Sequence, residues 1–159
     1  MTTYFYGIDG GKSTGAVCIA RQKIIWRRQA TPEEILSELD ARMARHGEHR
    51  SHPVLIGYEV FRQSGPARVT VQPEARDTAV RVEDLAARHG YLADGQTAAD
   101  AKHMVPDSLL RAAGLWTLPS EIGESDANDV NDAARHALLV MARKRASEFD
   151  GLLQRAYQA

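Results

Sequence analysis

The chain has 159 residues, of which 43% are hydrophobic and 26% are charged. This length and composition are typical of one globular domain with its own core, so we expect a single folded domain over residues 1–159 rather than a disordered chain. The formal net charge of −1 lacks the basic excess of many nucleic-acid-binding proteins. A cluster of acidic metal ligands can, however, lower the net charge of a protein that has basic patches elsewhere on its surface.

The single cysteine, Cys18, lies in an apolar run, so we interpret it as a core thiol. The first residues lack the basic region of a signal peptide, and no apolar run is long enough to span a membrane. The sequence therefore predicts a cytoplasmic protein with no membrane partner.

The predicted elements begin with three closely spaced strands over residues 4–8, 15–20 and 23–29, which favour an antiparallel meander. Thr31 and Glu34 then form a capping box, which predicts a helix to about residue 46. Residues 53–58 are almost continuously apolar, as in a central strand that is buried on both faces.

The second half of the chain is predicted to be mainly helical. After a mobile loop at 62–71, we expect a helix over 73–89, a short strand over 91–97 and a short helix over 107–113. A linker at 118–124 precedes a long helix over 126–146 and a small helix after it. The order predicts an α/β protein with a mixed five-stranded sheet flanked by helices, and it matches the RNase H-like fold.

Two acidic residues stand at the ends of predicted buried strands. Asp9 ends the first strand before a glycine pair, and Glu59 ends the central strand. Asp9 could instead cap a tight turn, and Glu59 could simply emerge into solvent. If both strands end at one edge of the sheet, the two carboxylates lie close together.

The last long helix places further acids on an apolar arc. Asp129 and Asp132 are three residues apart and so lie next to each other, with His136 on the same side, while Asn131 and Arg135 mark the polar strip. Asp129 could instead favour the helix dipole, an explanation that suits Asp132 less well. Like charges on a half-buried face repel, and a divalent cation would stabilise them.

Asp9, Glu59, Asp129 and Asp132 together suit Mg²⁺ or Mn²⁺, which prefer oxygen ligands. Two such ions can activate a water and stabilise the leaving oxygen of a phosphodiester. The sequence thus predicts a metal-dependent phosphodiester hydrolase.

Three segments resemble the RuvC-type Holliday junction resolvases, in the family's order. Residues 6–15 (YGIDGGKSTG) resemble the first-strand motif with its metal-binding Asp, and residues 56–61 (IGYEVF) resemble the central strand with its catalytic Glu. Residues 129–137 (DVNDAARHA) resemble the closing helix with two ligands. The sequence of residues 133–139 is especially similar to that of RuvC-related proteins of phages that infect actinobacteria.

This resemblance implies an RNase H-like endodeoxyribonuclease that cuts branched or four-way-junction DNA, with two Mg²⁺ or Mn²⁺ ions held by the four carboxylates. It also implies a basic residue near the scissile phosphate, at Lys102. The chain departs from the bacterial pattern at Gly10, where those enzymes usually have Pro. Phe61 also lies two residues after Glu59 rather than three, which puts its base-stacking role in question. We expect DNA contacts at Phe61, Arg62, Arg68, Arg76 and Lys102.

A homodimer is also implied, because paired cuts in a junction need two active sites. The helix over 73–89 is the expected contact surface, with apolar positions at Val80, Val82, Leu85 and Ala86.

Other functions remain open from the sequence. The Asp-Gly-Gly-x-x-Thr motif is also similar to the phosphate loop of sugar kinases of the actin-like superfamily, which need two such domains. An RNase H-like nuclease that acts on RNA–DNA hybrids or processes ribosomal RNA is a further alternative, as is a non-enzymatic nucleic-acid-binding module.

Overall fold

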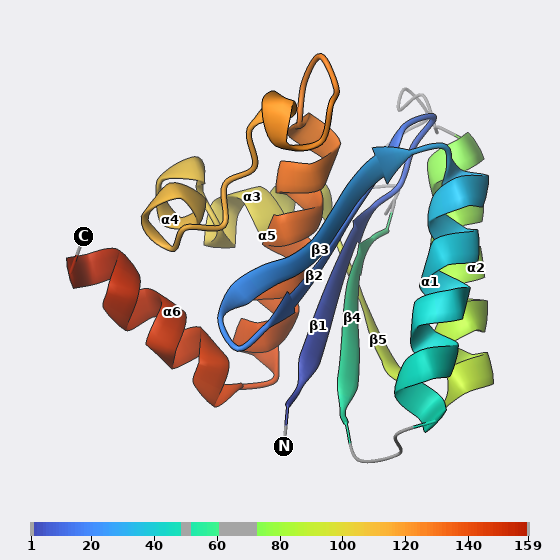
Figure 1. Cartoon of the computed structure of the whole chain (residues 1–159), viewed down its shortest axis with the longest axis horizontal. Coiled ribbons are helices and arrows are strands. Elements are labelled where there is room, and N and C mark those ends of the chain that lie inside the picture. The colour runs from blue at the N-terminus through green and yellow to red at the C-terminus, as the bar shows by residue number, and fades with distance from the viewer. Residues whose placement is uncertain (1, 49–51, 61–72, 159) are drawn as a thin grey trace, which may run out of the picture.

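The computed structural model describes residues 2–48, 52–60 and 73–158. Within these ranges the chain forms a five-stranded sheet with helices on both faces (Figure 1). The strands are β1 Tyr4–Asp9, β2 Thr14–Ala20, β3 Lys23–Ala30, β4 Val54–Glu59 and β5 Leu92–Gln96. The helices are α1 Pro32–Glu48, α2 Pro73–His89, α3 Ala98–Met104, α4 Asp107–Ala112, the 3-10 helix Pro119–Glu121, α5 Asn128–Arg143 and α6 Ser147–Gln158.

The sheet order is β3-β2-β1-β4-β5. β1, β2 and β3 pair antiparallel, whereas β4 is parallel to both β1 and β5. This topology confirms the predicted α/β class, the antiparallel first three strands and the parallel central strand. None of the helices in the described ranges has the length and apolar character needed to cross a membrane.

The two faces of the sheet pack against different helices (Figure 1). α1 and α2 cover one face, and α5 crosses the other, with α3, α4 and α6 beyond it. Side chains alternate along β1, so Phe5 joins the core under α5, while Tyr6 and Ile8 join the core under α1 and α2. By the same alternation Gly7 and Asp9 lie on the α5 face.

Glycines on three strands allow α5 to lie directly on the sheet. A Cβ atom at Gly7 would overlap the backbone carbonyl of Ala133, and one at Gly57 would overlap that of His136. Gly15 on β2 meets the backbone of Asp129 in the same way. This close approach brings the acidic side of α5 to the strand ends.

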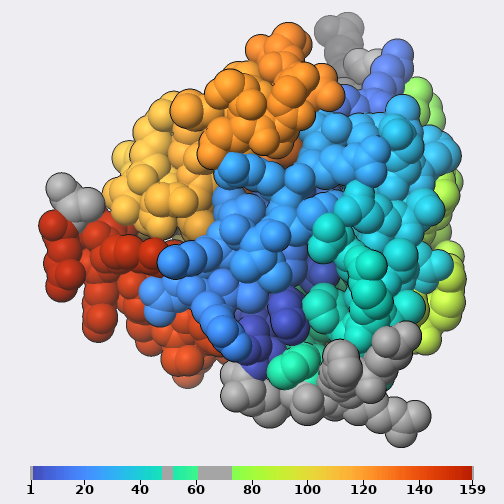
Figure 2. All heavy atoms as spheres, viewed as in Figure 1, coloured from blue at the N-terminus to red at the C-terminus, as the bar shows by residue number. Residues whose placement is uncertain are grey.

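β3 is the edge strand of the antiparallel half and is partly exposed between α1 and the segment that follows α4 (Figure 2). It carries Arg27, which forms an ion pair with Glu121 at 2.7 Å, and Arg28. Charged side chains on an edge strand oppose pairing with a second sheet.

Several predicted boundaries differ from the structure. β5 ends at Gln96, because the Thr97 hydroxyl instead accepts a hydrogen bond from the Asp100 N–H and caps α3, a helix that the sequence analysis missed. α5 starts at Asn128 rather than Asp126 and ends before Arg145, whose φ of 50° separates it from α6. The predicted mobile loop at 62–71 lies outside the described residues.

Candidate functional site

Asp9 and Glu59 lie side by side at the carboxyl ends of β1 and β4. The parallel register pairs Gly7 with Gly57 and Ile8 with Tyr58, so the next residue of each strand is an acid. Both side chains share the α5 face, because side chains two residues apart point to the same side of a strand. The two carboxylates are close enough to share a hydrogen bond.

α5 adds the other two predicted acids. Asp129 lies at its first turn, above β2, where its side chain accepts a hydrogen bond from Ser13. Asp132 lies one turn further along and faces a narrow gap that Asp9 and Lys102 also line. We call Asp9, Glu59, Asp129 and Asp132 the acidic cluster.

Burial and nearby acids raise the pKa of three members of the acidic cluster, Asp9, Glu59 and Asp129. Burial, followed by the hydrogen bond and charge of Glu59, raises the pKa of Asp9 to about 9. Burial also raises the pKa of Glu59 and that of Asp129, with nearby acids adding to the effect. In the metal-free protein Asp9 therefore keeps its proton at neutral pH and donates it to Glu59.

Asp132 differs from the other three acids because two cations already hold it. Its Oδ1 accepts a hydrogen bond from Arg135 Nε at 2.9 Å, and its Oδ2 lies 2.9 Å from Lys102 Nζ. The gap between Asp9 and Asp132 has no room for a water molecule. Among the described residues no group of three or more His, Cys, Asp or Glu side chains is arranged to hold a metal ion.

The acidic cluster nevertheless fits a divalent cation in its chemistry. It offers carboxylate oxygens on half-buried side chains, and the pKa values of Asp9, Glu59 and Asp129 are raised by burial and by nearby acids. The adjustment required is local, because the Lys102 side chain is 57% exposed and can swing away from Asp132.

The expectation that Asn131 and Arg135 form a polar surface strip is wrong, since both side chains are buried. Arg135 Nη1 donates to the Val105 carbonyl at 2.6 Å, and its Nη2 pairs with Asp107. Asn131 is bonded to the backbone of Thr117. These partners are distant in sequence, so helical spacing alone could not reveal them.

His136 is a satisfied core histidine. Its Nδ1 lies 3.0 Å from the side-chain oxygen of Gln96, and the residue is 1% exposed. Burial lowers its pKa to about 4, so the ring is neutral at physiological pH. Gln96, which the sequence analysis did not single out, fixes this ring from the end of β5.

The predicted DNA-contacting residues fall into two groups. Lys102 and Arg76 are exposed, the first beside Asp132 and the second in the first turns of α2, where Ala75 and Thr78 pack near Gly10. Phe61, Arg62 and Arg68 lie outside the described residues.

The expected dimer surface on α2 is mostly used within the chain itself. Val82, Leu85 and Ala86 are buried in the core under α1 and α2, and Val80 is 51% exposed. The apolar side chains of this helix thus pack against α1 and the sheet, except that of Val80.

The fold is shared with a structure of T. thermophilus RuvC in complex with a Holliday junction substrate. That comparison covers 91% of this chain and 96% of that one, with a TM-score of 0.56 and 16% sequence identity. A second structure of Thermus thermophilus RuvC matches with a TM-score of 0.50 and 15% identity, covering 91% of this chain and 97% of that chain. No protein-family model and no curated protein matches the sequence. The chain therefore has the fold of RuvC.

Proposed function

We propose that this protein is a divalent-metal-dependent endonuclease that cuts branched DNA, including four-way junctions, in the cytoplasm of a bacterial or phage-infected cell. The observation that carries the proposal is the acidic cluster itself. Asp9 and Glu59 end neighbouring parallel strands beneath α5, which brings two further acids to the same edge. That this edge belongs to a fold shared with a junction-bound RuvC supports DNA as the substrate.

Asp9, Glu59, Asp129 and Asp132 are the residues that would hold Mg²⁺ or Mn²⁺. Two bound ions would supply activation of a water and stabilisation of the leaving oxygen in phosphodiester hydrolysis.

The chain's own groups prepare this site for DNA. To hold such ions, Asp9 would lose to solvent the proton that it shares with Glu59, and Asp132 would give up its ion pair with Lys102. Lys102 Nζ would then be free to pair with a phosphate oxygen. Arg135 stays bonded to Val105 and Asp107 and holds Asp132 in place. The exchange links metal binding to phosphate binding through one side chain.

Cleavage of defined substrates tests the proposal. We expect Mn²⁺-dependent cutting of a four-way junction and much slower cutting of a linear duplex of the same sequence. D9N and D132N should each lower the rate by roughly 100-fold or more, because each removes a ligand charge of ions that contribute several kcal/mol to catalysis. Both variants should still bind the junction. E38Q, which alters an acid outside the cluster, is the matched control and should cut at the normal rate.

Each alternative has its own outcome in this experiment. Faster cutting of an RNA–DNA hybrid or of structured RNA than of branched DNA would show that RNA, rather than branched DNA, is the substrate. ATP turnover without nuclease activity would favour the sugar-kinase interpretation. A D9N variant that cuts at the normal rate would remove Asp9 from the mechanism.

We also propose that the active form is a homodimer, because a four-way junction has two equivalent strands to cut. Sedimentation at micromolar concentration, with and without junction DNA, checks this. A monomer under both conditions would exclude paired cutting and favour a nicking nuclease.

A further inference from the structure

A hollow of about 410 Å³ opens next to the acidic cluster, and the proposed cutting reaction does not use it. Two of its walls are Asp132 and Lys102, which belong to the cutting site. Trp116, Pro106 and Asn128 line it as well. The hollow and the acidic cluster are thus neighbouring compartments that share one carboxylate.

The segment that carries Trp116 is attached to α5 by two hydrogen bonds. The buried side chain of Asn131 accepts a hydrogen bond from the Thr117 N–H at 2.8 Å and donates one to the Thr117 carbonyl at 3.1 Å. Both Asn131 and Thr117 are almost fully buried. Asn131 precedes Asp132 in α5, and Thr117 follows Trp116. These two hydrogen bonds therefore fix the backbone beside Trp116 close to Asp132.

Arg111 further restrains the indole from outside the hollow. Its guanidinium carbon lies 3.7 Å from the centre of the Trp116 ring, a cation–π distance. Trp116 lines the hollow and Arg111 does not. Trp116 thus offers a preorganised aromatic surface beside Asp132.

The remaining lining indicates the kind of ligand. Two positive side chains, Lys102 and Arg135, are balanced by the negative Asp107 and Asp132, so the hollow as a whole does not select a charged group. A flat, neutral ring with polar edges suits an indole wall and the exposed amide of Asn128. A nucleobase has these properties, and aromatic side chains bind unstacked bases of any sequence through their faces.

We propose that this hollow binds an unstacked nucleobase of the DNA strand, from a nucleotide adjacent to the phosphate that is cut. The inference rests on the proposed function and deepens it. A phosphate at the acidic cluster and a base on Trp116 would both lie next to Asp132, which lines the hollow and the gap beside Asp9. Branch points supply such bases readily, because unpaired nucleotides cost less to unstack than paired ones.

Intrinsic fluorescence can report on the hollow directly. The sequence has two tryptophans, and Trp26 packs with the core under α1 and α2, on the other side of the sheet from Trp116. W26F therefore leaves Trp116 as the single reporter. In a D9N background with Mg²⁺, four-way-junction DNA should quench the Trp116 emission, and the reciprocal variant W116F should show no quenching of Trp26.

Affinity measurements against abasic junctions complete the test. W116L keeps an apolar side chain but lacks the aromatic face, and W116F retains one. We expect W116L to weaken junction binding at least about five-fold, as for the loss of one stacked base, and W116F to restore most of the affinity. An abasic nucleotide next to the mapped cut should weaken binding by the W116F protein but leave binding by W116L unchanged.

The outcomes separate this inference from the proposed function. Junction binding with equal affinity and equal abasic sensitivity in W116L and W116F would overturn the base subsite alone. Failure of the wild-type protein to bind junction DNA would overturn the proposed function and the subsite with it. Melting curves of W116L and W116F establish whether both variants are folded under the binding conditions. If W116L is unfolded, the fluorescence test decides: Trp116 emission that junction DNA does not quench in the W26F protein would overturn the subsite.

Discussion

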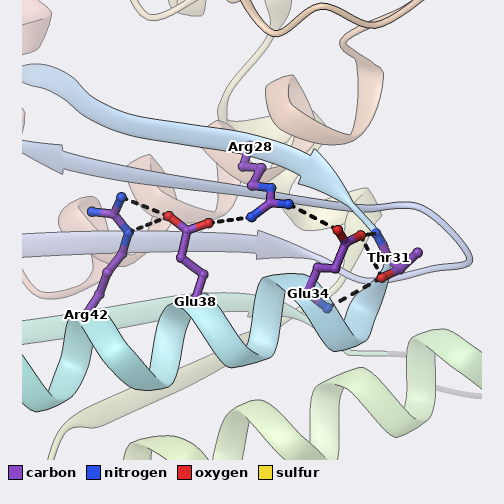
Figure 3. Close-up of polar contacts among 5 residues, drawn as sticks. All are labelled: Arg28, Thr31, Glu34, Glu38 and Arg42. Atoms are coloured by element: carbon purple, nitrogen blue, oxygen red, sulfur yellow. Dashed lines mark hydrogen bonds and ion pairs between the residues drawn. The ribbon is translucent and has the colours of Figure 1, made fainter.

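Two groups of carboxylates lie on opposite sides of the sheet and differ in their partners. On the α1 side, Glu38 accepts hydrogen bonds from Arg28 at 2.8 Å and from Arg42 at 3.0 Å, and Glu34 pairs with Arg28 and Thr31 (Figure 3). We call Arg28, Glu34, Glu38 and Arg42 the arginine-paired group. On the α5 side, the cations among the described residues that form ion pairs with the acidic cluster are Lys102 and Arg135, and both pair with Asp132.

The pKa values of the two groups move in opposite directions. Hydrogen bonds from Thr31 lower the pKa of Glu34, and although burial raises the pKa of Glu38, hydrogen bonds from both arginines lower it overall. Burial raises the pKa of Asp9, Glu59 and Asp129. The same type of side chain is thus stabilised as an anion in one place and left unstable as an anion in the other. The second arrangement is the one for which we propose a bound cation, whereas the first has its cations within the chain.

The largest expected effect on stability comes from the contact that assembles the acidic cluster. G57A adds a Cβ where the His136 carbonyl lies, so α5 must shift away from β4. We expect a loss of about 3 kcal/mol or more in unfolding free energy, at the upper end for overpacked cores. Urea unfolding measures it. Gly90, where a Cβ would meet nothing within 4 Å, is a control for the space around α5, although its φ of 71° adds a separate backbone cost to G90A. A G57A protein as stable as wild type would contradict direct packing of α5 on the sheet.

The pH dependence of stability without metal is the next expected effect. Because the folded pKa of Asp9 is about 9, above its ordinary value of 3.8, its contribution is lost as pH rises through the folded pKa. The folded pKa of His136 is about 4, below 6.5, so its contribution is lost as pH falls through that range. The two effects oppose each other below pH 6.5, which leaves a net fall in stability between about pH 6.5 and 9. Thermal melts in EDTA should show this fall, and D9N should reduce it; a flat profile would show that Asp9 is ionised throughout.

Replacing Lys102 should have a smaller effect, and it should change the affinities for Mn²⁺ and for junction DNA in opposite directions. Its ammonium pairs with Asp132 in the metal-free protein, and the hydrogen bond to Asp132 raises the pKa of Lys102. K102M should therefore tighten Mn²⁺ binding by up to about five-fold, the size of an exposed ion pair, while it weakens junction binding. Calorimetric titration of Mn²⁺ measures the first effect and DNA titration the second. Weaker Mn²⁺ binding by K102M would show that Lys102 does not compete with the metal.

The smallest change is expected in the arginine-paired group. E38Q removes one charge from a network at the surface of α1, so it should cost about 1 kcal/mol or less in unfolding free energy. Metal binding and DNA cleavage should be unchanged. A loss of metal binding in E38Q would mean that the two groups are coupled through the sheet.

Much of this arrangement can be predicted from local patterns. The apolar runs that end at Asp9 and Glu59, and the spacing of Asp129 and Asp132, indicated which elements carry the acids. The topology of β1 to β4 followed from short connections and one almost continuously apolar strand.

The remainder depends on contacts between distant residues. Gly7 and Gly57 look ordinary in a strand until the register places both under α5. Arg135 follows Asp132 at a helical spacing typical of a surface, yet it is buried because Val105 and Asp107 come from a separate segment. α3 could have been found, since Thr97 followed by Asp100 is a helix-start pattern.

Thermal unfolding with and without Mn²⁺ at neutral pH is the most direct test of the proposal that the acidic cluster binds metal because burial and repulsion between its carboxylates disfavour their ionised forms. The melting temperatures of the wild type and of E38Q should rise together in millimolar Mn²⁺, since a ligand at about 100 times its Kd adds about 2.7 kcal/mol to the folded state. D9N should gain little from Mn²⁺ and, without metal, should be at least as stable as the wild type. A wild-type melting temperature that Mg²⁺ and Mn²⁺ leave unchanged, or an equal rise in D9N, would contradict a metal centre at these residues.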